Sequence, residues 1–546
     1  MNFRPLKTIA LGVGLLQGPG LLWAQQAQTA AGPDTTARIS TAPPNWFNLD
    51  RATDRVTGVS TEKAYELLRN KTSRPVVVAV IDGGVDVKHE DLQGKLWTNP
   101  KETAGNGVDD DKNGFVDDVY GWNFIGGKDG KNVNEETYEL TRQYAALKKR
   151  FEGKQKVRRR EKADFEQYQK IKEEFETKVA ELKQQAEGYL KFAKAYKSAA
   201  AYLKTYLGKD SLTAADVDAI RPTDQQLGQA QKILQYAFEN GINEKELTEA
   251  EEYFDRSLNY GYNPDFDGRK VVGDDPNNLA EKGYGNNDVT GPDARHGSHV
   301  AGIIAANRAN SVGIKGVADN VQIMAIRAIP NGDERDKDVA NAIRYAVDNG
   351  AQIINMSFGK DYSPDKEYVD EAVRYAVSKG VLLVHAAGND SKNIDTENNF
   401  PTRKYAKGGQ ETALWLEIGA SSWGDNDNFV GKFSNYGKQT VDVFAPGVDV
   451  YSTTPDSKYE SLSGTSMAAP VTSGVAALLM SNYPQLTAAQ VKDILVKSSV
   501  KFADEKVNKP GEEKSETVAF GDLSISGGII NAYEAVKLAE SLSAQK

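Results

Sequence analysis

The 546-residue chain contains no cysteine. This excludes disulfide bonds, thiolate nucleophiles, cysteine-ligated zinc and iron–sulfur clusters. Histidine is scarce as well, with four in the chain, which argues against a histidine-rich metal centre and leaves few candidates for an imidazole base. Basic residues do not dominate, because the chain has 67 Lys and Arg but 77 Asp and Glu, which gives a net charge of −10. This balance argues against a nucleic-acid partner, since nucleic-acid-binding domains are usually basic.

Long apolar runs are missing beyond the N-terminus. Residues 1–24 combine Arg4 and Lys7 with a short apolar stretch, as in a secretory signal peptide. Gly18-Pro19-Gly20 shortens that stretch, which favours a cleaved signal over the alternative, a retained membrane anchor. No later segment reaches the ~20 apolar residues that a membrane helix needs. We therefore expect an exported protein, periplasmic or extracellular, with no membrane span after cleavage.

From residue 75 onward, apolar runs of strand length alternate with helical patterns. The runs lie at 76–81, 321–326, 351–356, 381–384, 414–418 and 441–444. Helical patterns separate several of them, for example at 338–349 and 366–379. Near-continuous apolar strands joined by helices are typical of a parallel sheet that is buried on both faces. The sequence therefore predicts an α/β fold, with a parallel sheet between two layers of helices.

One segment interrupts this alternation. Residues 101–221 contain no proline, and the pattern over 139–198 predicts a long helix with 17 Lys and Arg against 10 Asp and Glu. We expect a helical insertion over 129–258, which divides the main domain into two parts, 75–128 and 259–546. Before the main domain, we expect an N-terminal extension over 25–74 that packs on it. The basic face of the insertion is either solvated or docked on acidic groups. Apolar or small residues recur there in alternating steps of four and three, a heptad seam through Phe175, Val179, Leu182, Ala186, Tyr189, Ala193, Tyr196, Ala200 and Leu203.

Three motifs carry the chemistry of an activated serine. Asp82 ends the first strand run, His296 begins a helical run, and Ser466 follows Ser463-Gly464-Thr465. A serine hydroxyl needs a base, and the base needs a carboxylate that orients it. We expect Ser466 to be the nucleophile, His296 the base and Asp82 the orienting group. Asn389, after another strand run, would form an oxyanion hole with the backbone N–H of Ser466.

These motifs, in the chain order Asp, His, Ser, resemble those of the subtilisin-like serine peptidase family. The resemblance covers roughly 75–128 and 259–540. It implies a subtilisin-like fold and a serine endopeptidase that cleaves protein or peptide substrates through an acyl-enzyme. It also implies that Ser357, Phe358 and Gly359 bind the substrate. Gly359 and Gly388, which lack side chains, predict a substrate pocket that is open enough for a large apolar side chain.

The chain departs from the family pattern at several points. Gly83 follows Asp82, where the family usually has Ser or Thr, and Ser298 replaces the usual Thr. Residues 25–74 are too short for the usual inhibitory pro-domain, so the insertion is a candidate for covering the active site. Two other functions stay open: an esterase with the same triad, and a binding protein built on a degenerate peptidase.

An acidic loop predicts a structural calcium site. Residues 107–118 place oxygen-bearing side chains at alternate positions, with a glycine after the third of them. This spacing turns oxygens inward around Ca²⁺, although a full EF-hand is excluded because Tyr120 stands where its last ligand would be. The alternative is an acidic surface turn. The candidate ligands are Asp109, Asp111, Asn113, Phe115, Asp117 and Asp118.

Overall fold

The computed structural model describes residues 41–424, 428–511 and 516–544. Its centre is a nine-stranded sheet with the strand order β10-β13-β7-β6-β5-β4-β1-β3-β2. Neighbouring strands run parallel, except for β10 and β13 at one edge. The strands are β1 (Val76–Asp82), β2 (Gly121–Asn123), β3 (Val321–Arg327), β4 (Ile353–Met356), β5 (Leu382–Ala386), β6 (Trp415–Ser421), β7 (Val443–Pro446), β10 (Val500–Lys501) and β13 (Gly528–Ile529). Two hairpins lie outside it: β8 (Val450–Thr454) with β9 (Lys458–Leu462), and β11 (Lys506–Asn508) with β12 (Thr517–Ala519).

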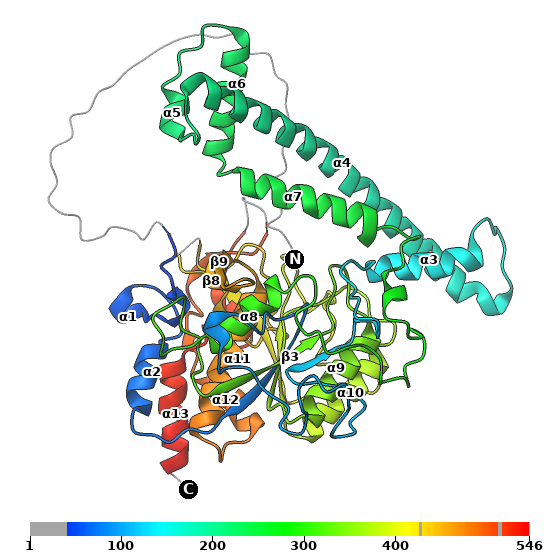
Figure 1. The fold of residues 1–546 in the computed structure, drawn as a ribbon, viewed down its shortest axis with the longest axis vertical. Coiled ribbons are helices and arrows are strands. Elements are labelled where there is room, and N and C mark those ends of the chain that lie inside the picture. The colour runs from blue at the N-terminus through cyan, green and yellow to red at the C-terminus, as the bar shows by residue number, and fades with distance from the viewer. Residues whose placement is uncertain (1–40, 425–427, 512–515, 545–546) are drawn as a thin grey trace.

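Helices cover both faces of this sheet (Figure 1). The helices of this domain are α8 (Arg295–Ala305), α9 (Asp336–Asp348), α10 (Lys366–Ser378), α11 (Thr465–Asn482), α12 (Ala488–Lys497) and α13 (Ala532–Ala544). Alternate residues of β1 serve the two layers: Val78 and Val80 pack with α8 and α11, whereas Ala79 and Ile81 pack with α9 and α10. The predicted α/β fold is confirmed, and the apolar strands reflect burial on both faces.

The segment before β1 is part of the same core. It holds two short helices, α1 (Arg51–Asp54) and α2 (Thr61–Leu68). Trp46 and Phe47 are fully buried in the cluster around α11, and the side chain of Asn531 hydrogen-bonds Ser60. The predicted signal peptide, residues 1–24, lies outside the described residues. Within the described residues, no helix combines the length and apolarity needed to cross a membrane.

A helical arm leaves the body between β2 and α8 (Figure 1). It contains α3 (Glu139–Phe151), α4 (Lys162–Leu207), α5 (Ala214–Asp218), α6 (Gln225–Glu239) and α7 (Glu244–Arg256). The helix predicted over 139–198 is interrupted after Phe151, where Gly153 adopts a φ of 75° that favours glycine. α4 then runs for 46 residues.

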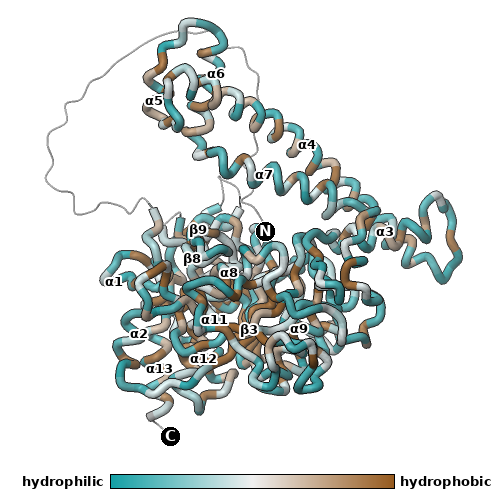
Figure 2. The backbone as a smooth tube through the Cα atoms, in the orientation of Figure 1, coloured by the Kyte–Doolittle hydropathy of each residue, from teal (hydrophilic) through white to brown (hydrophobic). Residues whose placement is uncertain are grey.

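The predicted heptad seam is the buried side of α4. Eight of its nine residues are buried, and Val179 is half-buried. The C-terminal half packs against α5, α6 and α7, and the N-terminal half packs against α3. Figure 2 shows hydrophobic residues concentrated in the body, while most residues along the arm are hydrophilic. The arm is therefore a small helical bundle with its own narrow core.

Candidate active site

Asp82 and His296 meet at the carboxyl edge of the sheet. Asp82 ends β1, and His296 lies in the first turn of α8. The His296 Nδ1 atom lies 2.8 Å from Oδ1 and 2.9 Å from Oδ2 of Asp82, whose side chain is nearly fully buried. The backbone N–H of Gly83 also donates to Asp82 Oδ1, at 2.7 Å. A buried carboxylate held in this way fixes the imidazole so that Nε2 faces away from it.

This close approach depends on Gly297. A Cβ at that position would lie 2.1 Å from the backbone oxygen of Gly84 and 3.0 Å from the Cβ of Asp82. Contacts that short are not tolerated against backbone, so any side chain there would push α8 away from β1. The neighbouring Ser298 hydroxyl accepts a hydrogen bond from the Asp86 N–H at 2.8 Å and ties the two segments together.

Ser466 lies in the first turn of α11, after the extended residue Gly464. Its hydroxyl donates to the backbone oxygen of Ser357 at 3.1 Å, and the Ser357 hydroxyl donates back to the backbone oxygen of Ser466 at 2.9 Å. Among the described residues, no hydrogen bond joins Ser466 to His296. Its backbone N–H belongs to the first helical turn, where N–H groups have no partner within the helix and can bind an anion.

Asn389 is oriented from the same helix. Its Oδ1 accepts hydrogen bonds from the backbone N–H of Thr465 at 2.8 Å and from the Thr465 hydroxyl at 3.0 Å. Because an N–H can only donate, the carbonyl side of this amide must face Thr465, which leaves Nδ2 as the outward donor. A Cβ at Gly464 would lie 3.6 Å from both Asn389 Nδ2 and Ser466 N. The two expected oxyanion donors therefore flank one position.

A series of buried side-chain hydrogen bonds holds Ser357 in place. Asn355 Nδ2 donates to the Ser357 hydroxyl at 2.9 Å, and the Ser473 hydroxyl donates to Asn355 Oδ1 at 2.9 Å. Asn355 and Ser473 are fully buried, on β4 and α11. These bonds couple the strand at Ser357 to the helix that carries Ser466, and the motifs gave no sign of them.

The segment after β4 offers a free backbone edge. Within the described part of the chain, no backbone–backbone hydrogen bond involves Phe358 or Gly359. Asn399 lies beside both expected pocket glycines: a Cβ on Gly359 would come within 2.3 Å of Asn399 Oδ1, and one on Gly388 within 3.4 Å of Asn399 Cγ. The amide of Asn399 therefore borders the pocket in which the two glycines predict room for a large apolar side chain, and no motif indicated it.

A family model and several known proteins match this chain. The subtilase family model matches residues 73–517. This chain belongs to the subtilase family. A thermophilic serine proteinase from Bacillus sp. strain AK1 is 39% identical over 228 residues, which cover 42% of this chain and 51% of that proteinase. Thermitase from Thermoactinomyces vulgaris is 40% identical over 220 residues (40% of this chain, 70% of thermitase). Subtilisin DY from Bacillus licheniformis is 36% identical over 212 residues (38% and 72%). The class of this chain is therefore that of the subtilisin-like serine proteases.

The acidic loop of this subtilase gathers three carboxylates. Oxygens of Glu102, Asp109 and Asp111 lie within 4.8 Å of one another, a spacing that could hold a cation. Glu102 was not among the expected ligands; its Oε1 accepts the N–H groups of Asp110 and Asp111, while its Oε2 is buried and without a hydrogen-bond partner.

The other expected ligands are engaged by protein donors. Asp117 accepts the N–H groups of Asn106 and Gly107, and the side chain of Asn113 links Asp118 to the backbone of Phe115. Burial raises the pKa of Asp118 to about 6, even though Tyr345, Asn99 and Asn113 donate to it. The cluster around Glu102 is thus the stronger candidate centre.

The remaining histidines are structural. His299 is fully buried, and desolvation lowers its pKa to about 3, so it stays neutral. His385 hydrogen-bonds Glu417 at 2.8 Å inside the core. His89 accepts the Asp91 N–H and contacts the carbonyl of Lys458. None of the three hydrogen-bonds Ser466.

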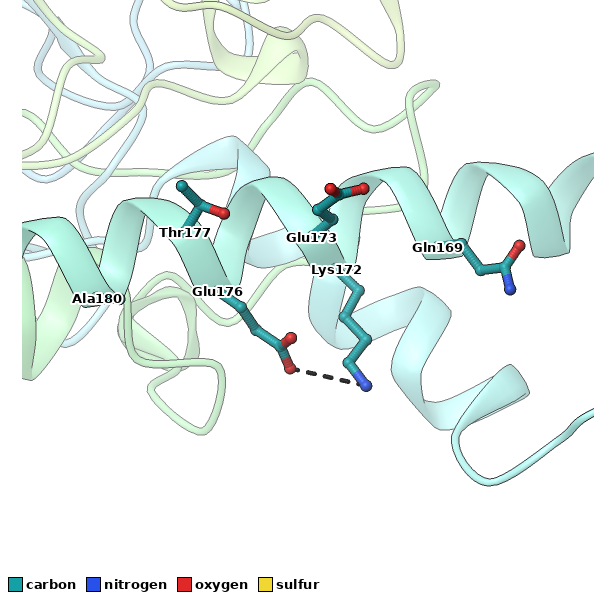
Figure 3. Close-up of a pocket in the computed structure, with 6 residues that line it drawn as sticks. All are labelled: Gln169, Lys172, Glu173, Glu176, Thr177 and Ala180. Atoms are coloured by element: carbon teal, nitrogen blue, oxygen red, sulfur yellow. Dashed lines mark ion pairs between the residues drawn. The ribbon is translucent and has the colours of Figure 1, made fainter.

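A shallow hollow lies on one side of α4 (Figure 3). Its lining residues all belong to that helix, and the Lys172–Glu176 ion pair, at 3.7 Å, crosses it. Side chains that project from one face of one helix enclose no ligand. The lining residues are Gln169, Lys172, Glu173, Glu176, Thr177 and Ala180.

Proposed function

We propose that this subtilase is an exported endopeptidase in which Ser466, His296, Asp82 and Asn389 perform the reaction. Two helix starts, each beside one of the expected partner residues, carry the proposal. The first turn of α8 brings His296 to the buried carboxylate of Asp82, and the first turn of α11 brings Ser466 beside the oriented amide of Asn389.

The reaction follows from these positions. The Ser466 O–H turns from the Ser357 carbonyl toward His296 Nε2, which takes its proton as Oγ bonds to the substrate carbonyl carbon. The carbonyl oxygen becomes an anion, stabilised by Asn389 Nδ2 and the Ser466 N–H. His296 then gives its proton to the leaving amine, which leaves an acyl-enzyme. Water repeats the sequence and releases the acid.

The substrate is proposed to be an extended peptide. It would pair with the free backbone at Phe358 and Gly359, as a strand added to an edge. Its side chain beside Gly359 and Gly388 would meet the Asn399 amide, which favours a polar or modest-sized residue over a large apolar one. Comparing kcat/KM across peptides that differ only at that residue tests this preference.

Calcium is the proposed ion of the acidic loop. Glu102 Oε2 is a buried oxygen without a hydrogen-bond donor, next to the carboxylates of Asp109 and Asp111, and such oxygens are the ligands Ca²⁺ prefers. These three residues would hold the ion, and its role would be to stabilise the loop. Export is proposed from residues 1–24 and is tested by sequencing the N-terminus of protein recovered outside the cytoplasm.

The central experiment is labelling with a serine-directed fluorophosphonate, run beside peptide turnover. We expect the full chain to be labelled and to cleave a chromogenic peptide, and Ser466→Ala to lose both activities while it keeps its melting temperature. A folded parent chain that neither labels nor cleaves would refute the proposal. Turnover of an ester without any turnover of the matched peptide would instead indicate an esterase.

A further inference from the structure

The helical arm is fixed to the body directly after the substrate-binding segment. Lys360, Asp361 and Tyr362 follow Gly359, and each contacts the arm. The Lys360 Nζ lies 3.1 Å from Glu139 of α3, and the Asp361 carboxylate lies 3.3 Å from Lys178 of α4.

One ion pair of this attachment is buried, whereas Asp361 and Lys178 are 40% and 37% exposed. The side chains of Lys360 and Glu139 are 2% and 7% exposed, and Arg142 and Lys360 outweigh desolvation to lower the pKa of Glu139 to about 2. Tyr362 hydrogen-bonds Glu174, and its ring packs against the cluster between α3 and α4. Breaking these contacts would strand buried charges, so this end of the arm is the permanent one.

The second attachment lies beside the proposed base. Arg295, which precedes His296, lies 3.4 Å from Glu249 of α7 and 2.7 Å from Glu460 of β9. Lys245 of α7 lies 3.5 Å from Glu460. The side chains of this charged quartet range from 19% to 65% exposed, and exposed ion pairs are weak and screened by salt.

One face of α7 is turned toward the body next to the proposed catalytic residues. Lys245, Glu249 and Tyr253 are spaced by four residues and share that face. Tyr253 lies near Asp390, the residue after Asn389; burial and this carboxylate raise the pKa of Tyr253. Eight residues of helix span about 12 Å, so the face reaches from the side of His296 to the side of Asn389. Figure 1 shows α7 passing over the body above α8.

We propose that α7 is a bar across the active site that admits extended, unfolded chains and excludes folded proteins, with Lys245 and Glu249 holding it in place. The inference rests on the proposed peptidase function. The bar does not close the site completely, because the His296 side chain is 25% exposed and Ser466 and Asn389 are only half-buried. A thin peptide can reach these groups beneath α7, whereas a loop on a globular surface brings its whole domain against the helix.

The test reverses the charges of α7 at the weak attachment. In Lys245→Glu/Glu249→Lys, the new lysine faces Arg295 and the new glutamate faces Glu460, so both contacts become repulsive while the net charge is unchanged. Glu187→Lys/Lys191→Glu is the matched control. It swaps an ion pair of the same spacing on α4, 2.6 Å apart, and among the described residues neither side chain forms an ion pair with the body.

The readout compares three substrates: a short chromogenic peptide, a disulfide-bonded folded protein, and that protein after reduction and alkylation. We expect the parent and the control to cleave the unfolded form at least 100-fold faster than the folded form. The α7 variant should lose at least tenfold of that preference, with peptide kcat/KM within twofold of the parent. Raising the ionic strength should shift the parent in the same direction.

The proposal is overturned if the parent shows no preference for the unfolded form, or if the α7 variant keeps the parent's preference. It is also overturned if the cleavage of peptide and of folded protein rises equally in the variant, because α7 would then block the site for every substrate. Failure of the peptidase function itself would look different, since the parent would then cleave no peptide. If the α7 variant does not fold, a second test uses the double variant Lys245→Cys/Glu460→Cys. A short bis-maleimide then joins the two cysteines and fixes α7 to β9. The cysteine-free chain permits this selective cross-link, which should further suppress only folded-protein cleavage.

Discussion

Gly464→Ala should remove catalysis while leaving the fold intact. The new methyl carbon would lie 3.6 Å from Asn389 Nδ2 and 3.6 Å from Ser466 N, in ordinary van der Waals contact with both. A developing oxyanion must come within 2.7–3.1 Å of the same two donors, so we expect the methyl group to crowd the space in which it forms. The backbone accepts the change, because the φ of 167° and ψ of 159° at Gly464 are extended and open to any residue.

The expected magnitude follows from the donors that are lost. Loss of one oxyanion donor costs about 10²–10³ in kcat, or roughly 3–4 kcal/mol of transition-state stabilisation. Because the methyl group affects both donors, we expect Gly464→Ala to lower kcat for a peptide at least 100-fold, and by no less than Asn389→Ala. The melting temperature should stay within about 2 °C of the parent, since no existing contact is broken.

Gly297→Ala is the contrasting variant. Its Cβ would strike the Gly84 carbonyl at 2.1 Å, so this change should lower the melting temperature as well as activity. The assays are steady-state kinetics with a peptide substrate and thermal unfolding followed by circular dichroism. Gly464→Ala with near-parent kcat would refute the position assigned to the oxyanion. Gly464→Ala that melts as early as Gly297→Ala would refute the claim that the site tolerates a methyl group.

Three further predictions concern stability. In the unfolded chain His299 becomes protonated near pH 6.5, whereas burial keeps it neutral in the folded chain down to about pH 3. The stabilisation that comes from this difference is therefore complete above pH 6.5 and is lost as the pH falls. Urea unfolding should show that His299→Gln loses about 2 kcal/mol less unfolding free energy than the parent between pH 7 and pH 5. Calcium should raise the melting temperature of the parent but not of Glu102→Gln, and a chelator should abolish the difference. Asn355→Ala should cost about 1–3 kcal/mol of unfolding free energy and also lower kcat, because the Ser357 hydroxyl loses its donor and the buried Ser473 hydroxyl loses its acceptor.

The features that the sequence predicts well are local in origin. The apolar runs that became β1, β3 and β4 needed no knowledge of their neighbours, because a strand buried on both faces is apolar throughout. Asp82 and His296 were found from short motifs, and the structure brings them within hydrogen-bonding distance. The assignment of their catalytic roles is still a prediction.

The features that escaped sequence analysis depend on contacts between distant segments. Asn355 is an unremarkable polar residue within an apolar run until Ser357 and Ser473 are placed on either side of it. Asn399 gives no motif, and its position beside Gly359 follows from how two loops pack. Glu102 could have been found as an acidic residue close to the loop at Asp109, but an acidic residue at that distance is too common a signal to use alone.

The basic face of the arm shows the same limit. Its composition left two outcomes open, a solvated surface or docking on acidic groups, and the structure contains both. Lys178 pairs with Asp361 on the body, whereas Lys191 pairs with Glu187 on its own helix. Net charge could not separate these cases, because the outcome depends on which turn of α4 passes the body.

Topology explains why an insertion at this point lies over the active site. In a parallel sheet, every connection from a strand to the following helix leaves at the carboxyl edge, where ligands bind. The arm occupies such a connection, between β2 and α8, and α7 contacts Arg295, which precedes His296, through Glu249. A long insertion here therefore leaves the body at the edge of the sheet where the catalytic residues lie, whatever its sequence. The sequence sets the orientation of the arm over the body, through Lys360 at the permanent attachment and through Lys245 and Glu249 at the weak one. Substitutions of these few side chains should therefore change which substrates are cleaved, while the catalytic reaction stays the same.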